Sequence, residues 1–349
     1  MQRTKRTHLH ARIRVAGIGS GGRTAVNRLI AGGAYGVDFV TLDTDTDALR
    51  ESLAPLVVRL SKTAADSRGA AGNVERGKEA ALASSMAIGK ALHGSDLVFV
   101  LAGLGGGTGS GAAPVVSQIA RREGALVIGI VTYPFSFEGS QRSTNARNGI
   151  EALRRCTDTL IVIPNDRLLN LSKGRVGFHE TYRLAQGFWG QSIQGISDLV
   201  NHSGLINVDF ADVRSIMAEG GAAIIATGRG HGQDRARKAA AAATRSNLLG
   251  VTVDGAHGVL FNVVGGPDMS LLEIEEAAEI ITTRVHPKAN VIFGAAINGA
   301  LEDEIRITVI ATGFAFKKPR GRFTDQASET VEIGERAQPW QLEPSHAGR

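Results

Sequence analysis

Short apolar runs alternate with longer stretches of helical periodicity over the first half of the chain. The runs are rich in Val, Ile and Leu and occupy residues 13–19, 37–45, 96–103, 125–135 and 158–165. The stretches between them predict helices at 23–33, 74–92 and 113–124. Near-continuous apolar strands separated by helices are typical of a parallel sheet covered on both faces. The first half therefore predicts an α/β domain, whose ligands bind at the carboxyl ends of the strands.

The pattern changes after residue 180. Residues 180–203 predict one long helix, which ends near Ser203 and Gly204. Beyond it, periodicity predicts strands at 221–227, 258–264, 290–297 and 304–312, and helices at 233–246 and 270–285. The last strand alternates polar and apolar residues, which indicates one wet face. We expect a smaller α+β domain, joined to the first domain through the long helix.

Periodicity and charge set the limits of these regions. Residues 1–12 form a basic arm without periodicity, and hydrophobic periodicity ends again at Lys317. We therefore expect five regions, with disorder at both ends of the chain. They are a basic arm at 1–12, an α/β domain at 13–179, the central helix at 180–203, an α+β domain at 204–316 and a disordered tail at 317–349.

Composition narrows the class of protein. The chain has 349 residues, of which 43% are hydrophobic, enough for two packed cores. Its longest apolar stretches fall short of the roughly 18 residues that span a bilayer, and its one cysteine, Cys156, forms no disulfide framework, so a cytoplasmic protein is expected. The net charge of +5 is concentrated in the first 14 residues and at 317–322. With aromatic residues at only 5%, solvated arms are favoured over nucleic-acid binding.

The densest chemistry lies between the third predicted strand and its following helix. Six of the nine residues from Gly103 to Gly111 are glycine, and Thr108 and Ser110 add hydroxyl groups. A glycine-rich strand-to-helix loop lets backbone N–H groups approach a phosphate closely, although a tight packing turn is the structural alternative. No Gly-Lys-Ser/Thr follows, so this is not a Walker loop.

Two further loops bear on the ligand. Residues 17–22 satisfy G-x-G-x-x-G after the first strand, and Asp43 ends the second strand. This spacing is that of a dinucleotide-binding fingerprint, so an NAD-dependent oxidoreductase is an alternative. A third turn, rich in Gly and Ala, lies at 68–73. Three such loops favour one nucleotide with several phosphates, held from several sides.

Residues 105–111 read GGGTGSG, which is the tubulin/FtsZ signature. The chain resembles FtsZ, the prokaryotic relative of tubulin, over residues 13–316. Supporting stretches lie at 131–142, 158–169, 204–214, 258–268 and 303–314. The resemblance implies a tubulin/FtsZ-type parallel-sheet GTPase domain, a long central helix and a smaller α+β domain. It also implies subunits that stack head to tail into the filaments of the cytokinetic ring, in the cytoplasm at the mid-cell division site.

The resemblance places contacts to GTP or GDP on the three loops and on nearby strand and helix ends. These residues are Gly19, Ser20, Gly21, Gly22, Arg23, Thr24, Asp43, Ala71, Gly72, Asn73, Gly103, Gly105, Gly106, Gly107, Thr108, Gly109, Thr132, Glu138, Arg142, Asn165, Tyr182 and Gln186. By resemblance, Ala71 to Asn73 would face the γ-phosphate, and Glu138 and Arg142 would face the ribose and guanine. Since Glu138 and Arg142 are four residues apart, an i,i+4 ion pair is the simpler alternative.

The stretch NVDFADV contains Asn207, Asp209 and Asp212. In isolation, two acids three residues apart are typical of a helix start. The resemblance implies instead that this loop enters the neighbouring subunit's nucleotide pocket, where the carboxylates polarise the attacking water while Mg²⁺ and the phosphate loops stabilise charge. The expected protein is therefore a GTPase whose site is completed by assembly.

Several positions depart from the family pattern. Arg23 and Thr24 replace glycine and asparagine, Asp43 replaces asparagine, and Tyr182 and Gln186 replace phenylalanine and asparagine. These changes support the alternative of a divergent paralogue that co-assembles with weak or no GTPase activity of its own. FtsZ tails commonly dock membrane anchors or division regulators. The tail here offers only Trp340 as an apolar anchor.

Overall fold

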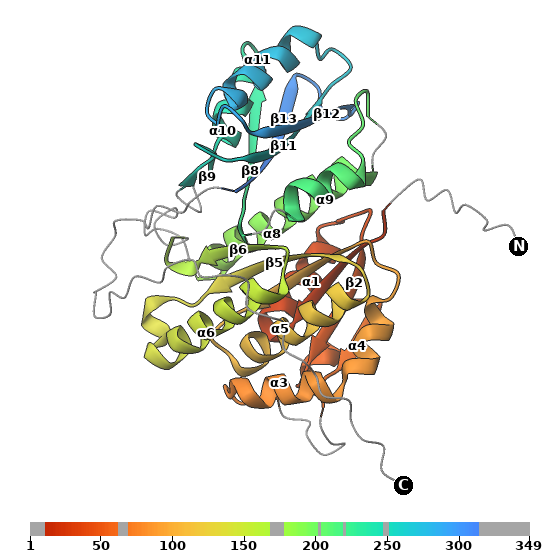
Figure 1. Ribbon diagram of the computed structural model, residues 1–349, viewed down its shortest axis with the longest axis vertical. Coiled ribbons are helices and arrows are strands. Elements are labelled where there is room, and N and C mark those ends of the chain that lie inside the picture. The colour runs from red at the N-terminus through yellow and green to blue at the C-terminus, as the bar shows by residue number, and fades with distance from the viewer. Residues whose placement is uncertain are drawn as a thin grey trace, which may run out of the picture. The chain divides into compact units, whose positions relative to one another are not determined.

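The computed structural model describes residues 11–61, 69–167, 178–201, 204–218, 221–246 and 251–313 (Figure 1). Within 178–188 only the backbone is described. The expected disordered tail at 317–349 lies outside the described residues, as do residues 1–10 of the expected basic arm.

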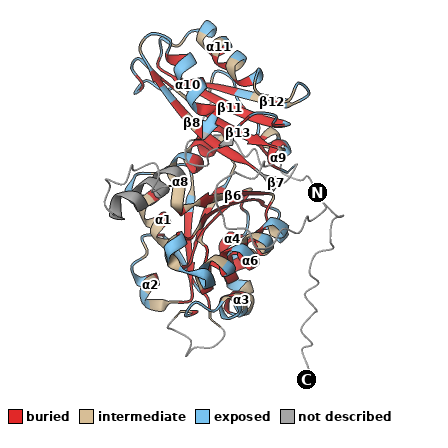
Figure 2. Cartoon of the chain, turned by 90° about the vertical axis from the view of Figure 1, so that its left-hand side faces the viewer, coloured by how far each residue is buried: buried red, intermediate tan, exposed pale blue. Residues whose placement is uncertain are grey.

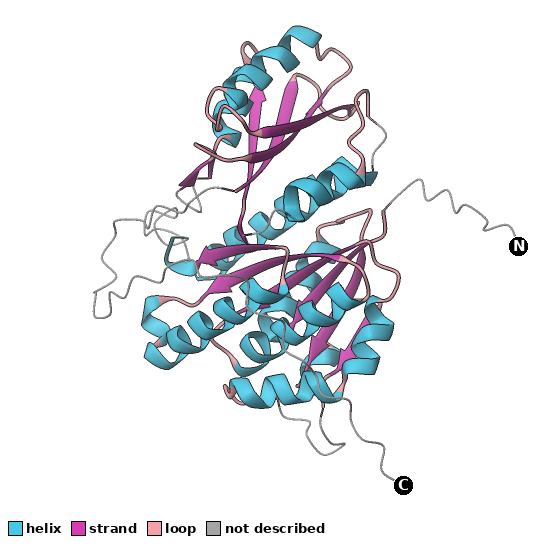
Figure 3. Ribbon diagram, viewed as in Figure 1, coloured by secondary structure: helices cyan, strands magenta, loops and turns pink. Residues whose placement is uncertain are grey.

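The first half of the chain forms a parallel sheet, as predicted. Its strand order is β3-β2-β1-β4-β5-β6-β7, and every pair is parallel. The strands are β1 (Ile13–Ile18), β2 (Asp38–Asp43), β3 (Leu56–Arg59), β4 (Leu97–Gly103), β5 (Leu126–Tyr133), β6 (Thr159–Pro164) and β7 (Gly221–Ala222). The final strand, β7, comes from beyond the central helix, so the chain returns to this sheet before it enters the second one. Figure 3 shows the strands in magenta and the helices in cyan.

Helices cover both faces of the larger sheet, which explains why its strands read as continuous apolar runs. In β4, Phe99 and Leu101 face the core that contains α1 and α8, whereas Val98 and Val100 face the core that contains α4, α5 and α6. Figure 2 shows buried residues along the strands and on the helix sides that face them. The helices are α1 (Gly19–Ala31), α2 (Thr46–Arg50), α3 (Val74–Ala83), α4 (Ser85–Leu92), α5 (Gly107–Arg122), α6 (Ser140–Cys156) and α8 (Phe178–Asn201), with a 3-10 turn at Ser136–Glu138.

The prediction of one helix over 74–92 is wrong, because the helix divides at Ser84. The Ser84 hydroxyl donates to the carbonyl of Arg59 (3.4 Å) and accepts from the N–H of Ser61 (3.1 Å). These bonds tie the break to the end of β3, a four-residue edge strand that was not predicted from the sequence. The helix expected from 113 also starts earlier, at Gly107, so the glycine-rich segment forms its first turn.

The second half of the chain forms a four-stranded mixed sheet in the order β12-β11-β13-β8. β11 pairs in parallel with β12 and antiparallel with β13, which pairs antiparallel with β8. These elements and their neighbours are β8 (Ile224–His231), β11 (Gly258–Gly265), β12 (Asn290–Ile297), β13 (Glu304–Thr312), the short strands β9 (Arg245–Ser246) and β10 (Val251–Thr252), and the helices α9 (Phe210–Ala218), α10 (Arg235–Ala243) and α11 (Leu271–Thr282). The α/β plus α+β architecture is confirmed.

The small sheet is also covered on both faces. Ile305, Ile307 and Val309 of β13 pack against α10 and α11, while Ile310 joins the core of α8 and α9. The single wet face predicted for this strand is therefore wrong: Thr308 is buried, and a Cβ on Gly195 of α8 would lie 2.6 Å from its methyl group. α8 and α9 thus share one core with the inner faces of both sheets.

Candidate functional site

A cavity of about 270 Å³ lies where β1, β2 and β4 end. Three glycine-rich segments enclose it: the start of α1, the turn before α3, and the loop between β4 and α5. Its lining residues are Gly19, Ser20, Gly21, Asp43, Asp45, Ala48, Gly69, Ala70, Ala71, Gly72, Gly103, Gly106, Gly107, Thr108 and Gly109. The three loops predicted from the sequence to hold one nucleotide therefore converge on one cavity.

Two helix N-termini meet at this cavity. α1 starts at Gly19 and α5 at Gly107, and neither start carries a side-chain cap from the described residues. The first N–H groups of a helix have no partner within the helix and carry a partial positive charge. Together they form an anion-binding site, which suits the phosphates of a nucleotide.

The density of glycine in this region has two separate causes. A Cβ on Gly109 would lie 2.2 Å from the carbonyl oxygen of Gly103, and a Cβ on Gly111 would lie 2.1 Å from that of Val74. These glycines let α5 pack against β4 and α3. Gly106, in contrast, lines the cavity and has no atom within 4 Å of its Cβ position. Only part of the motif therefore serves access for a ligand, and the rest serves packing.

Asp43 lies at the end of β2 and is 3% exposed. Its Oδ1 accepts hydrogen bonds from the N–H of Thr44 (2.7 Å) and of Asp45 (3.3 Å). Its Oδ2 is buried and has no hydrogen-bond partner among the described residues. Burial raises the pKa of this carboxyl above its usual value, while the two N–H donors act in the opposite direction. No three His, Cys, Asp or Glu side chains of the described ranges converge as a metal site.

Neighbouring side chains fix the shape of the cavity. The Thr44 and Thr108 hydroxyls lie 2.6 Å apart, which links the end of β2 to the signature loop. The buried Asn145 of α6 donates to the carbonyl of Gly72 (3.2 Å) and to that of Gly105 (3.1 Å). Asn145 thereby holds two of the three loops together.

Some predicted nucleotide contacts lie outside the cavity lining. Arg23 pairs with Glu51 at 2.8 Å, and the Thr24 hydroxyl donates to the carbonyl of Ser20 within α1. A Cβ on Gly22 would lie 2.3 Å from the carbonyl oxygen of Leu101, so Gly22 serves packing. Asn73, a predicted contact that also lies outside the lining, caps α3 by accepting a hydrogen bond from the N–H of Arg76.

Other predicted contacts lie on elements next to the cavity. Arg142 and Glu138 form the i,i+4 ion pair, at 2.6 Å. A Cβ on Gly105 would lie 3.2 Å from the Cβ of Arg142, so the pair borders the signature loop. Thr132 and Asn165 are buried at the ends of β5 and β6. Tyr182 and Gln186 belong to the part of α8 whose side chains are not described.

The three predicted catalytic residues surround the start of α9. Asp209 accepts from the N–H of Ala211 (3.4 Å), Asp212 accepts from the N–H of Asp209 (3.3 Å), and Asn207 accepts from the N–H of Gly204 (2.6 Å). Within one chain they therefore cap a helix and a turn, and none of them lines the glycine-rich cavity. Asn207 and Asp209 are exposed.

Four lining residues are not among the predicted contacts: Asp45, Ala48, and Gly69 and Ala70 of the predicted turn at 68–73. Asp45 is the N-cap of α2, accepting from the N–H groups of Asp47 and Ala48, and α2 itself was not expected. The signal for Asp45 was its position two residues after Asp43 in a Thr/Asp-rich segment. Asn145 could have been found as a polar residue on the buried face of an amphipathic helix.

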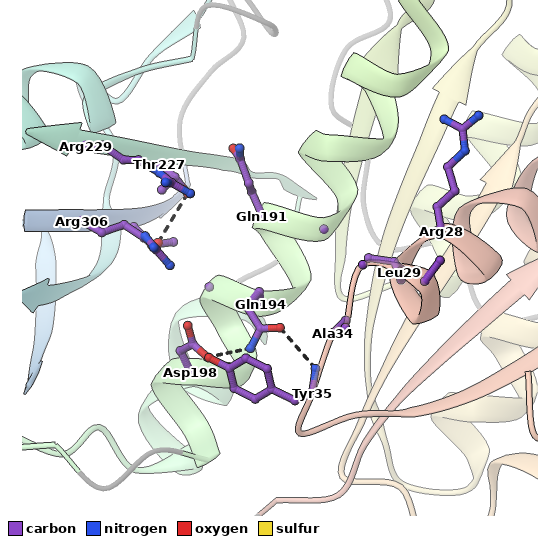
Figure 4. A pocket seen from close by; sticks show the side chains of 16 residues that line it. Arg28, Leu29, Ala34, Tyr35, Gln191, Gln194, Asp198, Thr227, Arg229 and Arg306 are labelled. Carbon is purple, nitrogen blue, oxygen red and sulfur yellow. Dashed lines mark hydrogen bonds between the residues drawn. The ribbon is translucent and has the colours of Figure 1, made fainter. Parts of the chain in front are cut away.

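A second cavity, of about 610 Å³, lies between the end of α1, α8 and the strands β8 and β13 (Figure 4). On one side the N–H of Tyr35 donates to Gln194 (3.5 Å), whose amide donates to Asp198 (2.7 Å). Burial, followed by the Asp198 carboxylate, raises the pKa of Tyr35. Arg229 and Arg306 approach from the small sheet. This cavity shares no lining residue with the glycine-rich cavity.

Two family matches cover most of the chain. Residues 12–173 match the Tubulin/FtsZ family, GTPase domain, and residues 221–315 match the FtsZ family, C-terminal domain. None of the helices in the described part is long and apolar enough to cross a bilayer.

Similar solved structures agree with these matches. An empty FtsZ dimer from M. jannaschii is 39% identical, with a TM-score of 0.80 over 87% of this chain and 88% of that chain. A GTPγS-bound protofilament of CetZ2 from Haloferax volcanii is 20% identical, with a TM-score of 0.72 over 86% of this chain and 93% of that chain. The latter supports the fold alone. The two domain matches and the 39% identity to FtsZ show that this chain belongs to the FtsZ family of tubulin-like proteins.

Proposed function

We propose that this protein binds GTP in the glycine-rich cavity and hydrolyses it to GDP and phosphate in a head-to-tail filament that forms the cell-division ring. One observation carries the proposal: the cavity and the Asp209/Asp212 pair lie at opposite ends of the strands of the larger sheet. The cavity is at the carboxyl ends of the strands. Arg214 of α9 donates to the carbonyls of Asp96 and Gly124, which precede β4 and β5 at the amino ends.

This separation favours a site completed between two subunits. A seven-residue strand such as β4 is about 23 Å long. A carboxylate must lie within hydrogen-bond distance of the water it activates, so Asp209 and Asp212 cannot serve the cavity of their own chain. If a second copy stacked so that the amino ends of its strands met the carboxyl ends of the first copy's strands, its carboxylates would reach the open cavity. Because Asn207 and Asp209 are exposed, they are accessible to such a neighbour.

The chain's own residues would divide the work as follows. The N-termini of α1 and α5 and the open face at Gly106 would hold the phosphates. Asp209 and Asp212 of the adjacent subunit would orient and polarise the attacking water. The cavity also fits Mg²⁺, because Asp43 and Asp45 offer carboxylate oxygens; when bound, the ion neutralises charge on the phosphates.

The division role rests on membership of the family. We propose the domain limits 13–179 and 204–316 as the nucleotide-binding and catalytic-loop domains, and a cytoplasmic, mid-cell location. The tail at 317–349, outside the described residues, is the proposed docking segment for a membrane anchor or division regulator.

The test is a complementation assay. Asp212→Ala retains the cavity but loses the catalytic loop, whereas Gly106→Val fills the cavity but retains the loop. Each variant alone should lose GTP turnover by roughly a hundredfold. A mixture should recover activity, because the loop of one subunit serves the cavity of the other. Phosphate release is measured against protein concentration with light scattering, and ATP is the control nucleotide.

Other outcomes have distinct meanings. Unchanged turnover in Asp212→Ala would show that the loop is not catalytic. GTP binding without turnover by the unmodified protein at any concentration would favour the partner-dependent paralogue. Absence of guanine-nucleotide binding would reopen the dinucleotide hypothesis, and the absorbance of co-purified cofactor would identify NAD.

A further inference from the structure

The turn before α3 is strained where it lines the glycine-rich cavity. The N–H of Asn73 donates to the carbonyl of Ala70 (2.9 Å). Between them, Ala71 and Gly72 have positive φ angles of 47° and 77°. This is the pattern of a type I′ turn, in which both central positions favour Gly or Asn. The Cβ of Ala71 disfavours this left-handed region, so the conformation persists only where neighbouring groups hold it.

Asn145 of α6 holds this turn. Its side-chain amide donates to the carbonyls of Gly72 (3.2 Å) and Gly105 (3.1 Å), and so joins the turn to the signature loop. An amide nitrogen carries two hydrogens, and the two carbonyl acceptors use both of them. Asn145 Oδ1 accepts from the side-chain amide of Gln141 (3.1 Å), and Asn145 is only 8% exposed. Loss of this buried donor would therefore deprive two carbonyl oxygens of their partner.

The two segments that Asn145 joins are held unequally. The N–H of Gly105 also donates to the buried hydroxyl of Ser110 in α5 (2.8 Å), so the signature loop has a further attachment of its own. The turn at Ala71, in contrast, has an unfavourable backbone conformation. Loss of the Asn145 amide should therefore release the turn and leave the signature loop nearly in place.

The position of the turn indicates which part of a nucleotide depends on it. Two of the three segments around the cavity are the N-termini of α1 and α5, which can each hold a phosphate. The turn is the third segment, and a third phosphate requires it. We propose that Asn145 is a positioning residue that fixes the Ala71–Gly72 turn for the terminal phosphate of GTP, and thereby sets the preference of the site for GTP over GDP. This rests on the proposed GTP site, which Asn145 does not itself line.

The experiment compares the affinities of GTP and GDP for the full chain, at protein concentrations below those that scatter light. Each nucleotide displaces a fluorescent GDP analogue in the same buffer. Asn145→Ala should bind GTP roughly tenfold more weakly than the unmodified protein, and GDP at most about threefold more weakly. Asn148→Ala, an exposed asparagine three residues further along α6, is the matched control and should behave as the unmodified protein.

A second substitution tests whether the amide acts through the turn. Glycine adopts a φ of 47° without strain, so Ala71→Gly reduces what Asn145 has to hold in place. The double variant Asn145→Ala/Ala71→Gly should recover at least about threefold of the lost GTP affinity. If Asn145→Ala does not fold, the exposed Gln141→Ala replaces it, because this change removes only the bond that orients the amide. Gln141→Ala should weaken GTP binding by about threefold.

The results separate the two proposals, and thermal unfolding of each variant confirms that it is folded. Unchanged GTP binding in Asn145→Ala, equal loss of GTP and GDP affinity, or no recovery in the double variant would overturn the role of Asn145 and leave the GTP site in place. Unchanged GTP binding in Gln141→Ala would do the same where that variant replaces Asn145→Ala. Absence of guanine-nucleotide binding by the unmodified protein would overturn the GTP site and the role of Asn145 together.

Discussion

At the scale of single residues, the glycines of the signature loop do different work. Gly109 and Gly111 permit backbone contacts between α5 and its neighbours, whereas Gly106 faces the open cavity. Sequence alone shows six similar glycines in a row of nine, because packing and ligand access both require the absence of a side chain. Only the position of a neighbouring carbonyl distinguishes the two roles.

Alanine substitutions should separate these roles. Gly106→Ala places a methyl group in open space at a φ of −83°, so its stability should stay within about 0.5 kcal/mol of the unmodified protein. Its affinity for GTP should fall by roughly tenfold, because the methyl group occupies the phosphate cavity. Gly109→Ala should instead lose about 3 kcal/mol of stability, since its Cβ would clash with the carbonyl of Gly103. Urea denaturation and a nucleotide titration provide both numbers. Equal loss of stability in the two variants would contradict this division.

At the scale of elements, helix starts and strand ends explain most differences from the predictions. β3 was missed because it has four residues at the edge of the sheet, with Leu56 and Val57 exposed, and so lacks a buried apolar run. The helix start that Asp209 and Asp212 indicate was only an alternative interpretation of these acids, and the structure shows that helix, α9, at Phe210–Ala218. The central strands were predictable, since burial on both faces requires the apolar residues that the sequence displays.

The helix predicted over 270–285 is α11, and the structure shows a reciprocal capping box between Ser270 and Glu273 at its start. It also shows what the sequence could not: Arg235 of α10, only 6% exposed, donates to Glu273 at 2.7 Å and to Asp268 at 2.6 Å. The two acids are 33 and 38 residues away along the chain, so no local pattern connects them to Arg235.

This cluster should make stability depend on pH. Hydrogen bonds from Arg235 lower the pKa of Glu273 below its ordinary value of 4.5. A lowered pKa stabilises the folded state above pH 4.5, and this contribution is lost as the pH falls through the folded-state value. Glu273→Gln should cost about 2 kcal/mol at pH 7, and this difference should shrink in acid. Thermal melts from pH 7 to pH 3 measure the effect. The control is the exposed Glu275→Gln, and parallel melting profiles for the two variants would refute the assignment.

At the scale of the whole molecule, α8 joins the two sheets through one shared core. Trp189, Ile193 and Ile196 of α8 pack in the same cluster as Leu101 of the larger sheet and Ile310 of the smaller. The long helix and both sheets were predictable from periodicity. The core that they share was not predictable, because the contact between α8 and β13 involves Gly195 and Thr308. Neither residue is a large apolar residue that would indicate a core position in the sequence.

Substitution of Gly195 tests the packing of α8 against β13. A Cβ there would lie 2.6 Å from the Thr308 methyl group, so Gly195→Ala should lose about 2 kcal/mol of stability. Gly190→Ala, on the same helix, is the control, because its Cβ would lie 3.4 Å from the flexible end of Leu29. Thermal unfolding compares the two proteins, and a Gly195→Ala protein as stable as Gly190→Ala would show that α8 does not bear tightly on β13.

The cavity and the Asp209/Asp212 pair lie at opposite ends of the strands of one sheet, and this placement determines how many complete sites a filament contains. In a filament built as proposed, every junction between neighbours makes one complete site, so n subunits contain n − 1 sites. One terminal subunit has an open cavity that no neighbour serves, and the other presents acids with no nucleotide before them. The two tips are therefore chemically different. Average turnover per subunit depends on length, being half the limiting value in a dimer and close to the limit in a long filament.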